Sequence, residues 1–583
     1  MPDRLLSPAE RAAEESRAKV IECINGHQSF LLEAGAGAGK TYSLIEALRY
    51  LIAGHGIKLL RQRQQVACIT YTNVAVDEIR SRTDGHRAIL SSTIHSFCWT
   101  LIKPFQEYLR ERLPHLPGWG ERLEDTDGIG KRRVEYSLGY PIARRDEDHV
   151  FLSHNDVLLL TVSLLKEAKF RNLLAARYPI LLIDEYQDTN KEFAEALSTF
   201  VVGKDERMLV GFFGDHWQKI YDEGCGKIEH PALHFIGKGA NFRSAPIIVD
   251  VLNRMRPELT QEVSAPDAEG SVAVYHTNDW TGRRLFGQNW GGDLPADASG
   301  NYLDGLVKKL SNEGWSFESN KTKLLMLTHR VLAERQGYAS FGAIYPYNDA
   351  YLKKEDPHIA FLVDTVEPVC IAYENKRFGE MFAALSERTP AIESHAAKLA
   401  WSRDLNRLLE LRTTGTIGDV LDHLRQTERP RLPEAVEQAG NELDRVPQAS
   451  NDEDSEAVSR LRKLREISYQ ELIALARFIN EETPFATKHG VKGAEFENVL
   501  VVIGRGWYRY NFVQFLEWAG APDTIPEGEM ETFERNRNLF YVVCSRPKKR
   551  LAILFTQEIT DRAMATLAQW FQRNAIYPLH LPA

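Results

Sequence analysis

Three apolar runs of the chain end abruptly in residues that can carry chemistry. The stretch SFLLEAGAGAGKTYSLIEALRYLI predicts a short strand, a glycine-rich turn and an amphipathic helix that begins at about Lys40. The stretch YPILLIDEYQDTN predicts a buried strand, residues 179–183, that ends in Asp184 and Glu185. The stretch GFFGDHWQKIY predicts a third strand, which ends in Gly-Asp and is followed by Gln218. The first run has the strand–turn–helix order that a phosphate-binding loop requires.

The glycine-rich turn predicts a nucleotide site. Gly35, Gly37 and Gly39 allow backbone N–H groups to turn inward around phosphate oxygens, next to the positive end of the helix. Lys40 supplies a positive charge for the β- and γ-phosphates, and the Thr41 hydroxyl can bind Mg²⁺. The strict pattern begins with glycine, where this chain has an alanine. A flexible linker would explain the glycines, but the apolar, patterned flanks do not fit a linker.

The two acids at the end of the second run complete such a site. Asp184, at the strand end, would reach Mg²⁺ mostly through water. Glu185 could polarise the attacking water as a general base. Two acids can also simply cap a core strand, but the Lys-Thr pair upstream makes that interpretation unlikely here. We therefore expect ATP and Mg²⁺ as cofactors.

Length, charge and cysteines narrow the class of protein. A chain of 583 residues is too long for one core and predicts several domains. The formal net charge of −9 gives no overall attraction to nucleic acid, although it leaves room for a local basic groove. Six scattered cysteines without a CxxC pair argue against a zinc site, an iron–sulfur cluster or a disulfide framework. No apolar run is long enough for a membrane helix and the start is no signal peptide, so we expect a cytoplasmic protein without membrane contact.

Several motifs resemble those of UvrD/Rep/PcrA-type superfamily 1 DNA helicases. DEYQDT resembles their DExQ box, and AGAGAGKT resembles their first motif, in which alanine is usual at the opening position. ITYTNVAVDEIRSR and SSTIHSFC resemble two motifs that contact single-stranded DNA. The resemblance implies that Tyr71 stacks on a base, that Thr72 and Asn73 lie near the phosphates, and that Thr93 and His95 also contact DNA.

The same resemblance explains the glutamine after the third strand. GDHWQKIY resembles the motif whose glutamine senses the γ-phosphate, so Gln218 would bond this phosphate or the attacking water. An amide suits the task because it both donates and accepts without adding charge. The simpler alternative is a polar loop that leaves a core strand.

Later motifs extend the resemblance to the second half of the chain. GANFRSAPIIVDVLN implies an adenine-stacking Phe242 and an arginine finger, Arg243, with Tyr42 of the first motif also at the nucleotide. By the same resemblance, Arg546 in RNRNLFYVVCSRPKKRL is a second arginine finger. An arginine suits this role because its planar guanidinium can interact with several developing charges at once. TKHGVKGAEFENVLVV implies a Glu495 that holds the ribose.

Two further regions bear on the predicted site: the start of TKHGVKGAEFENVLVV, and SRAKVIEC upstream of the phosphate loop. By resemblance, Thr487, His489 and Lys492 face DNA. The family usually has a glutamine roughly twenty residues before the lysine of the phosphate loop, which reads adenine. This chain has SRAKVIEC there, so other nucleoside triphosphates remain open.

The motif order implies an α/β fold with two RecA-like P-loop NTPase cores. Each core would have a parallel sheet and would be interrupted by a mainly helical insertion. The expected ranges are 1–98 and 178–245 for the first core, 99–177 for the first insertion, 246–344 and 484–583 for the second core, and 345–483 for a reduced second insertion.

The leading functional hypothesis is an ATP-dependent DNA translocase or helicase. It would track on single-stranded or partly duplex DNA, 3′ to 5′ as the family does, in anti-phage defence or DNA repair. KLLMLTHRVLAERQGY and GDHWQKIY resemble a compact Gabija-type subgroup, whose members are often encoded beside OLD-family nucleases in anti-phage systems. An alternative from this resemblance is a DNA- and nucleotide-sensing subunit that controls a partner nuclease without processive unwinding.

A third alternative is an intrinsic nuclease. Asp364, Glu374 and Lys376 form a D…ExK pattern in which acids could hold Mg²⁺ and lysine could activate water. This pattern arises easily by chance.

Overall fold

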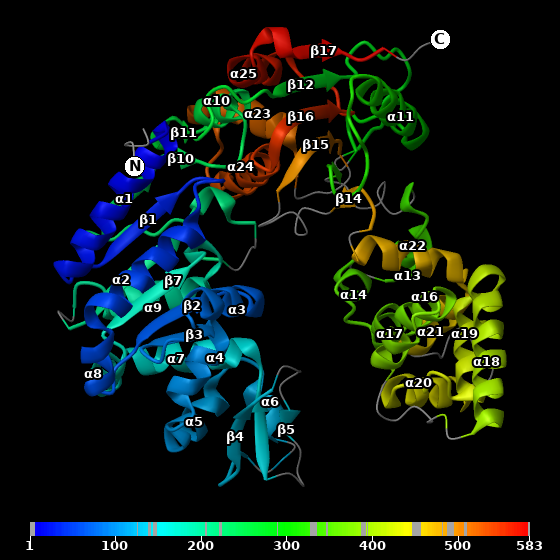
Figure 1. Cartoon of the computed structure of the whole chain (residues 1–583), viewed down its shortest axis with the longest axis horizontal. Helices are drawn as coiled ribbons and strands as arrows, with labels where there is room; N and C mark the ends of the chain where they lie inside the picture. The colour runs from blue at the N-terminus through cyan, green and yellow to red at the C-terminus, as the bar shows by residue number, and fades with distance from the viewer. Residues whose placement is uncertain are drawn as a thin grey trace.

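The computed structural model describes most of the chain. The described residues are 6–124, 126, 128–137, 142–143, 148–204, 207–220, 224–287, 290–326, 335–345, 348–385, 392, 394–445, 456–480, 482–486, 495–505 and 510–580. They form two parallel sheets with helices on their faces, as expected for an α/β protein with two RecA-like cores. Figure 1 shows these two cores and a separate bundle of helices. In the described part, no helix is both long and apolar enough to cross a membrane.

The first sheet carries the three apolar runs. Its strand order is β3-β2-β7-β8-β1-β9, and every neighbouring pair is parallel. Strands β1 and β7 are buried along their whole length, because helices cover both faces of a parallel sheet. The strands are β1 (Phe30–Ala34), β2 (Val66–Thr70), β3 (Ile89–Thr93), β7 (Ile180–Asp184), β8 (Leu209–Gly214) and β9 (His234–Lys238). The helices are α1 (Pro8–Asn25), α2 (Lys40–Arg61), α3 (Asn73–Arg82), α4 (Ile94–Ile102), α7 (His154–Leu165), α8 (Ala168–Arg177) and α9 (Lys191–Phe200).

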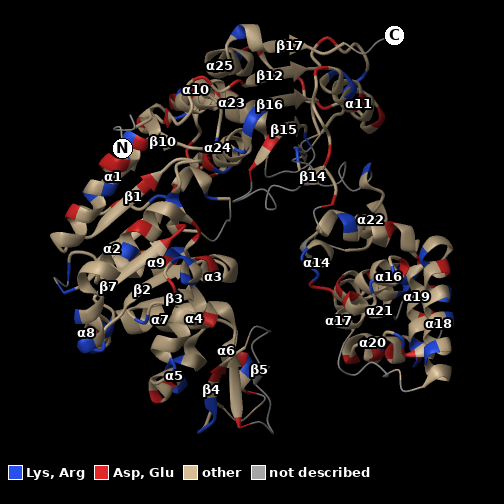
Figure 2. Cartoon of the chain, viewed as in Figure 1, with Lys and Arg blue, Asp and Glu red and all other residues tan. Residues whose placement is uncertain are grey.

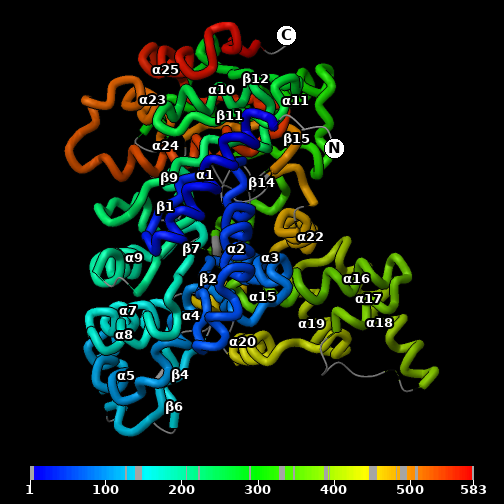
Figure 3. The backbone as a smooth tube through the Cα atoms, turned by 60° about the vertical axis from the view of Figure 1, so that its left-hand side comes forward, coloured from blue at the N-terminus to red at the C-terminus, as the bar shows by residue number. Residues whose placement is uncertain are grey.

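The second sheet is also fully parallel. Its order is β14-β13-β15-β16-β12-β17. The strands are β12 (Ser271–His276), β13 (Thr322–Met326), β14 (Phe485–Ala486), β15 (Phe496–Ile503), β16 (Pro547–Phe555) and β17 (Ile576–Pro578). The helices are α10 (Pro246–Met255), α11 (Ala296–Asn312), α23 (Phe512–Gly520), α24 (Met530–Cys544) and α25 (Asp561–Phe571). A short parallel pair, β10 (Ala240–Asn241) and β11 (Glu262–Val263), joins the cores, and α1 packs against it and against β9 (Figure 3).

The first insertion contains helices and a small sheet that we did not predict. Strands β4 (Arg133–Tyr136), β5 (Ile142–Ala143) and β6 (His149–Leu152) form it in the order β4-β6-β5. They follow α5 (Gln106–Arg112) and α6 (Trp119–Glu124). The strands of each large sheet fall inside the ranges expected for its core. We propose these ranges as the domain boundaries with two changes. Helices α7 and α8 pack with the first core, although the range 99–177 included them, and α13 (Ala339–Ile344) packs in the helical bundle, although the range 246–344 included it.

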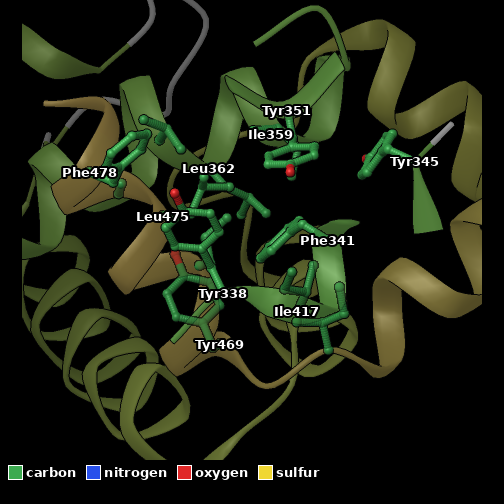
Figure 4. Packing of buried hydrophobic residues seen from close by; sticks show 14 of the residues in the cluster. Tyr338, Phe341, Tyr345, Tyr351, Ile359, Leu362, Ile417, Tyr469, Leu475 and Phe478 are labelled. Atoms are coloured by element: carbon green, nitrogen blue, oxygen red, sulfur yellow. The ribbon is translucent and has the colours of Figure 1, made fainter. Parts of the chain in front are cut away.

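The second insertion is a helical bundle with aromatic residues in its core. Figure 4 shows the rings of Tyr338, Phe341, Tyr351 and Phe478 among aliphatic side chains, and all four are buried. Acidic and basic residues are interspersed over both cores and this bundle (Figure 2). The bundle helices are α13 (Ala339–Ile344), α14 (Asp349–Leu352), α15 (Pro357–Phe361), α16 (Glu367–Glu374), α17 (Phe378–Ala384), α18 (His395–Thr414), α19 (Ile417–Thr427), α20 (Glu434–Arg445), α21 (Glu456–Glu466) and α22 (Tyr469–Ile479).

Candidate active site

The phosphate loop joins β1 to α2. Its residues Gly37 and Gly39 have φ angles of 76° and 72°, in the left-handed region that favours glycine. A Cβ atom on Gly37 would also lie 2.8 Å from the Asn241 side-chain oxygen. Lys40 is the first residue of α2, so the positive end of this 22-residue helix faces the loop. The sequence therefore folds locally into the anion-binding geometry that the glycines predicted.

Asp184 and Glu185 lie beside this loop, as predicted. Lys40 Nζ is 3.7 Å from Glu185 Oε2. Asp184 ends β7 and is 5% exposed, and its Oδ1 atom is buried without a hydrogen-bond partner among the described residues. Burial and the charge of Glu185 raise the pKa of Asp184 to about 7. A buried, unpartnered carboxylate oxygen fits a hard cation, so Asp184 with Thr41 in the first turn of α2 suits Mg²⁺.

The backbone of Glu185 is held in an uncommon conformation. Its φ angle is 47°, a conformation that costs a residue with a side chain about 1–3 kcal/mol and persists only where the surrounding structure holds it. The Gln187 amide supplies part of that support, donating to Glu185 Oε2 at 2.5 Å and accepting from the Asp215 N–H at 3.0 Å. Gln187 was not among the predicted site residues, although it is the glutamine of the DExQ box. It ties the end of β7 to the end of β8.

A small cavity connects the two acids with the predicted DNA-contact motif. Its volume is about 10 Å³, which is roughly the space that one water molecule needs. Tyr71 lines it together with Asp184 and Glu185. The cavity lies at the carboxyl ends of neighbouring strands β2 and β7. A residue predicted to stack on DNA therefore borders the water-sized space next to the predicted general base.

Gln218 bridges the two cores. Its Nε2 donates to Asp215 Oδ2 at 2.6 Å, and its Oε1 accepts from Arg546 at 3.1 Å. Arg546 lies between α24 and β16 of the second core and is 1% exposed. Burial and the nearby charge of Arg243 lower the pKa of Arg546 to about 9. The predicted γ-phosphate sensor, Gln218, and the predicted arginine finger, Arg546, are thus in direct contact. An anionic ligand would compensate the charge of this buried guanidinium.

Arg243 lies in the link between β10 and α10, next to the phosphate loop. Its guanidinium donates to the Ser545 carbonyl at 3.1 Å and has its Nε atom 3.9 Å from a Glu495 carboxylate oxygen. The backbone N–H of Phe242 donates to the Gly37 carbonyl at 2.9 Å. The rings of Phe242 and Tyr42 are 44% and 58% exposed, so both are accessible to a base. The structure brings all the predicted nucleotide residues of this group to the loop between the cores.

A buried ionic cluster next to Gln218 links the cores, and no motif in the sequence indicated it. Arg256 donates to Asp215 at 2.6 Å and to Glu33 at 2.7 Å, and Glu33 also accepts from His216 and Tyr186. Burial raises the pKa of Glu33, but the hydrogen bond and charge of His216 and the charge of Arg256 outweigh it and lower the pKa to about 2. Glu33, Asp215 and His216 are close enough to hold a metal ion. Here the guanidinium takes that place. We call these five residues the Arg256 cluster.

The predicted DNA-contact residues of the first core follow β2 and β3, which are neighbours in the sheet. Tyr71 is 45% exposed, Thr72 caps α3, which begins at Asn73, and Thr93 caps α4. The His95 ring packs against a second histidine, with ring centroids 4.4 Å apart, and burial lowers the pKa of His95 to about 4.

Thr487, His489 and Lys492, predicted to face DNA, lie outside the described residues.

The proposed nuclease residues gain no support. Asp364 accepts from Lys354 Nζ at 2.6 Å, and Glu374 lies 3.8 Å from a guanidinium nitrogen of Arg412. In the described part of the chain, neither acid belongs to a group of acids and histidines that could hold a metal ion.

Several known proteins are similar to this chain in sequence. A family model described as AAA domain matches residues 17–223, which include the phosphate loop and both acids. The ATP-dependent DNA helicase Rep of Escherichia coli strain K12 is 26% identical over 40% of this chain and 42% of Rep. The ATP-dependent DNA helicase PcrA of Staphylococcus aureus strain Mu50 is 23% identical over 39% of this chain and 37% of PcrA. The resemblance to UvrD-like superfamily 1 helicases is confirmed.

A further relative matches far more of the chain than Rep and PcrA do. The Gabija protein GajB of Bacillus cereus strain HuB5-5 is 24% identical over 96% of this chain and 97% of GajB. The resemblance to the Gabija type therefore runs through both cores and both insertions.

Proposed function

We propose that the chain is an ATP-dependent DNA translocase or helicase of the UvrD-like type. The observation that carries the proposal is the hydrogen bond between Gln218 and Arg546 at 3.1 Å, because it joins the two cores at the nucleotide site. A nucleotide bound there touches groups from both cores, so its hydrolysis changes how the cores are held together. The similarity to Rep, PcrA and GajB supports this function.

In the proposed reaction, each side chain near the loop has a separate task. Lys40, which lies 3.7 Å from Glu185 in this structure, moves to the β- and γ-phosphates and frees the carboxylate to accept a proton from the attacking water. Arg243 and Arg546 stabilise the charge that develops on the γ-phosphate. Mg²⁺, held through Thr41 and Asp184, neutralises phosphate charge when it is bound.

Gln218 couples this chemistry to DNA. The amide bonds the γ-phosphate or the attacking water, and after hydrolysis it loses that partner and returns to the contacts seen here. The water-sized cavity lined by Tyr71 and both acids gives a second, shorter connection between DNA and the water. The chain then tracks on single-stranded DNA, 3′ to 5′ as in the family, and separates strands.

The test is steady-state hydrolysis of ATP and of GTP, with and without single-stranded DNA. The parent chain is expected to hydrolyse ATP faster with DNA, and Lys40→Ala is expected to lose this activity. Glu185→Gln serves as the matched variant, because it should still bind the Mg²⁺–nucleotide complex while hydrolysing it at least 10²-fold more slowly. Hydrolysis that is indifferent to DNA in the parent would refute the DNA-coupled motor. The ATP-to-GTP ratio tests the base preference left open by the missing upstream glutamine.

A regulatory role is the second candidate. The match to GajB spans 96% of this chain, whereas the match to Rep spans 40%, so much of the chain resembles a defence protein more than a housekeeping helicase. In this version the chain senses DNA and nucleotide and controls a partner nuclease of the OLD family. Strand separation assays decide between the two candidates: substantial unwinding by the isolated chain contradicts the purely regulatory version.

A further inference from the structure

A buried lysine beside the phosphate loop has two neutral hydrogen-bond partners. Lys238 is the last residue of β9 and is 1% exposed. Its ammonium donates to the Gly39 carbonyl at 3.2 Å and to the Ser43 hydroxyl at 2.7 Å. Both acceptors are neutral. Burial alone lowers the pKa of Lys238 to about 8, and no carboxylate in the described part of the chain forms an ion pair with it.

The position of this charge is unfavourable without an anion. Gly39 and Ser43 lie at the N-terminus of α2, where the helix dipole is positive and a cation is repelled. Taking an ammonium out of water is also unfavourable unless a negative charge compensates for it. An ammonium has three N–H donors, and the two neutral oxygens account for two of them. The site therefore has the charge and the donor for an anionic ligand.

The order of the strands shows which part of a nucleotide lies there. The neighbours run β7-β8-β1-β9, so Asp184 and Gln218 lie on one side of the phosphate loop and Lys238 on the other. Register pairs Ala34, the last residue of β1, with Lys238. The γ-phosphate of a bound nucleotide would lie on the side of Asp184 and Gln218, which are the residues predicted to act on it. Lys238 is consequently at the nucleoside end.

Exposed aromatic rings mark the same end. The Lys238 ammonium lies 6.0 Å from the centroid of the Phe242 ring, which is the predicted partner of the base. Tyr42, one residue before Ser43, is also exposed. The phosphate nearest to a base stacked on these rings is the α-phosphate.

We propose that Lys238 binds the α-phosphate of the nucleoside triphosphate. This rests on the proposed function, because it uses the same nucleotide site. Lys40 then serves the β- and γ-phosphates, and Lys238 serves the α-phosphate from the opposite side of the loop. This second lysine gives the site an affinity for nucleoside di- and triphosphates that does not depend on reading the base.

The experiment compares two ligands by titration calorimetry, with Mg²⁺ and without DNA. The ligands are ADP and its α-P-methyl analogue, in which a methyl group replaces a charged α-phosphate oxygen. The parent chain is expected to bind ADP about 10- to 100-fold more tightly, the value of a charge-assisted hydrogen bond. Lys238→Met is expected to bind both ligands equally, with the affinity that the parent has for the analogue.

Two control variants separate phosphate binding from support of the loop. Ser43→Ala removes one hydrogen bond of Lys238 and should keep the preference for ADP. Lys40→Met should weaken both ligands by the same factor, because it acts on the β-phosphate. Lys238→Gln, which keeps a donor without the charge, is the second variant if Lys238→Met does not fold, and it should also lose the preference.

Two results would overturn the inference. A parent chain with equal affinity for the two ligands has no charge that contacts the α-phosphate. A Lys238→Met chain that weakens both ligands equally but keeps the preference for ADP shows that Lys238 only supports the loop. DNA-stimulated hydrolysis plays no part in this titration, so a failure of the proposed motor function would leave these outcomes unchanged.

Discussion

The Arg256 cluster makes a quantitative prediction about how the cores are held together. Arg256 follows α10, and its guanidinium contacts Glu33 at the end of β1 and Asp215 after β8. The two carboxylates are 2% and 0% exposed. Arg256→Met keeps most of the side-chain volume but removes the charge, and with it the contact of the guanidinium with the Trp217 ring. Two buried carboxylates would then face each other without their common cation.

The expected cost follows from this burial. Removing one partner of a buried ion pair typically costs about 3–5 kcal/mol, because the remaining charge stays in a medium of low dielectric. For a domain of this size, each kcal/mol lowers the unfolding temperature by about 2–4 °C. The unfolding midpoint should therefore fall by roughly 6–20 °C. Asp215 also accepts from Gln218, so DNA-stimulated hydrolysis should fall together with stability.

The assay is calorimetric unfolding of the parent, Arg256→Met and a control, Arg254→Met. Arg254 lies two residues earlier, and its side chain is 33% exposed. It donates to the Trp570 carbonyl at 3.0 Å and has an acidic partner 3.9 Å away, so its loss should cost about 1–2 kcal/mol, which is less than the loss of Arg256. A double variant, Arg256→Met with Asp215→Asn, removes one of the stranded charges and should recover part of the loss. If Arg256→Met unfolds at the same temperature as Arg254→Met, the carboxylates do not depend on this guanidinium and the reasoning is wrong.

Three further predictions concern single side chains. Burial lowers the pKa of His95 from 6.5 to about 4, so the unfolded chain binds more protons in that interval and stability falls as the pH drops. His95→Gln should therefore lose about 1–2 kcal/mol less stability than the parent between pH 7 and 4.5, so its unfolding temperature should fall less over this range. An equal fall in the parent and in His95→Gln would contradict this prediction. Arg546→Lys should slow single-turnover ATP hydrolysis by about 10³-fold, since an ammonium lacks the planar fork, and a loss below tenfold would argue against a finger. Tyr71→Ala should weaken binding of single-stranded DNA by about 1–3 kcal/mol in fluorescence anisotropy, whereas the exposed Val74→Ala should not. Equal effects of the two variants would count against base stacking.

Much of the fold could be predicted because local sequence patterns specify the buried strands and the phosphate loop. The runs that became β1, β7 and β8 are apolar apart from Glu33 in β1 and Asp184 at the end of β7, and each ends where a glycine or an acid follows. Buried parallel strands need such runs, and a phosphate loop needs its glycines in one short stretch. The small β4-β6-β5 sheet has no comparable signal, since its strands have only two to four residues each. The first insertion was for that reason expected to be mainly helical.

In the candidate site, too, some features could be predicted from the sequence and others could not. Lys40 and Asp184 could be named from local motifs with their own chemistry, and Gln218 and Arg546 from the resemblance of their motifs to those of UvrD-like helicases. The contacts between these residues could not be predicted, because a hydrogen bond between residues 218 and 546 depends on how the two cores pack against each other.

The most buried charges were also beyond the sequence. Glu33, Asp215 and Arg256 are far apart along the chain, and each would be an ordinary polar residue in its own segment. Only the folded chain removes them from water, and a charge removed from water must find an opposite charge or a ligand. The sequence by itself determined the phosphate loop, the acids and the class of fold. The tertiary structure decided which charges compensate one another, as in the Arg256 cluster, and which one, Lys238, is left for a ligand.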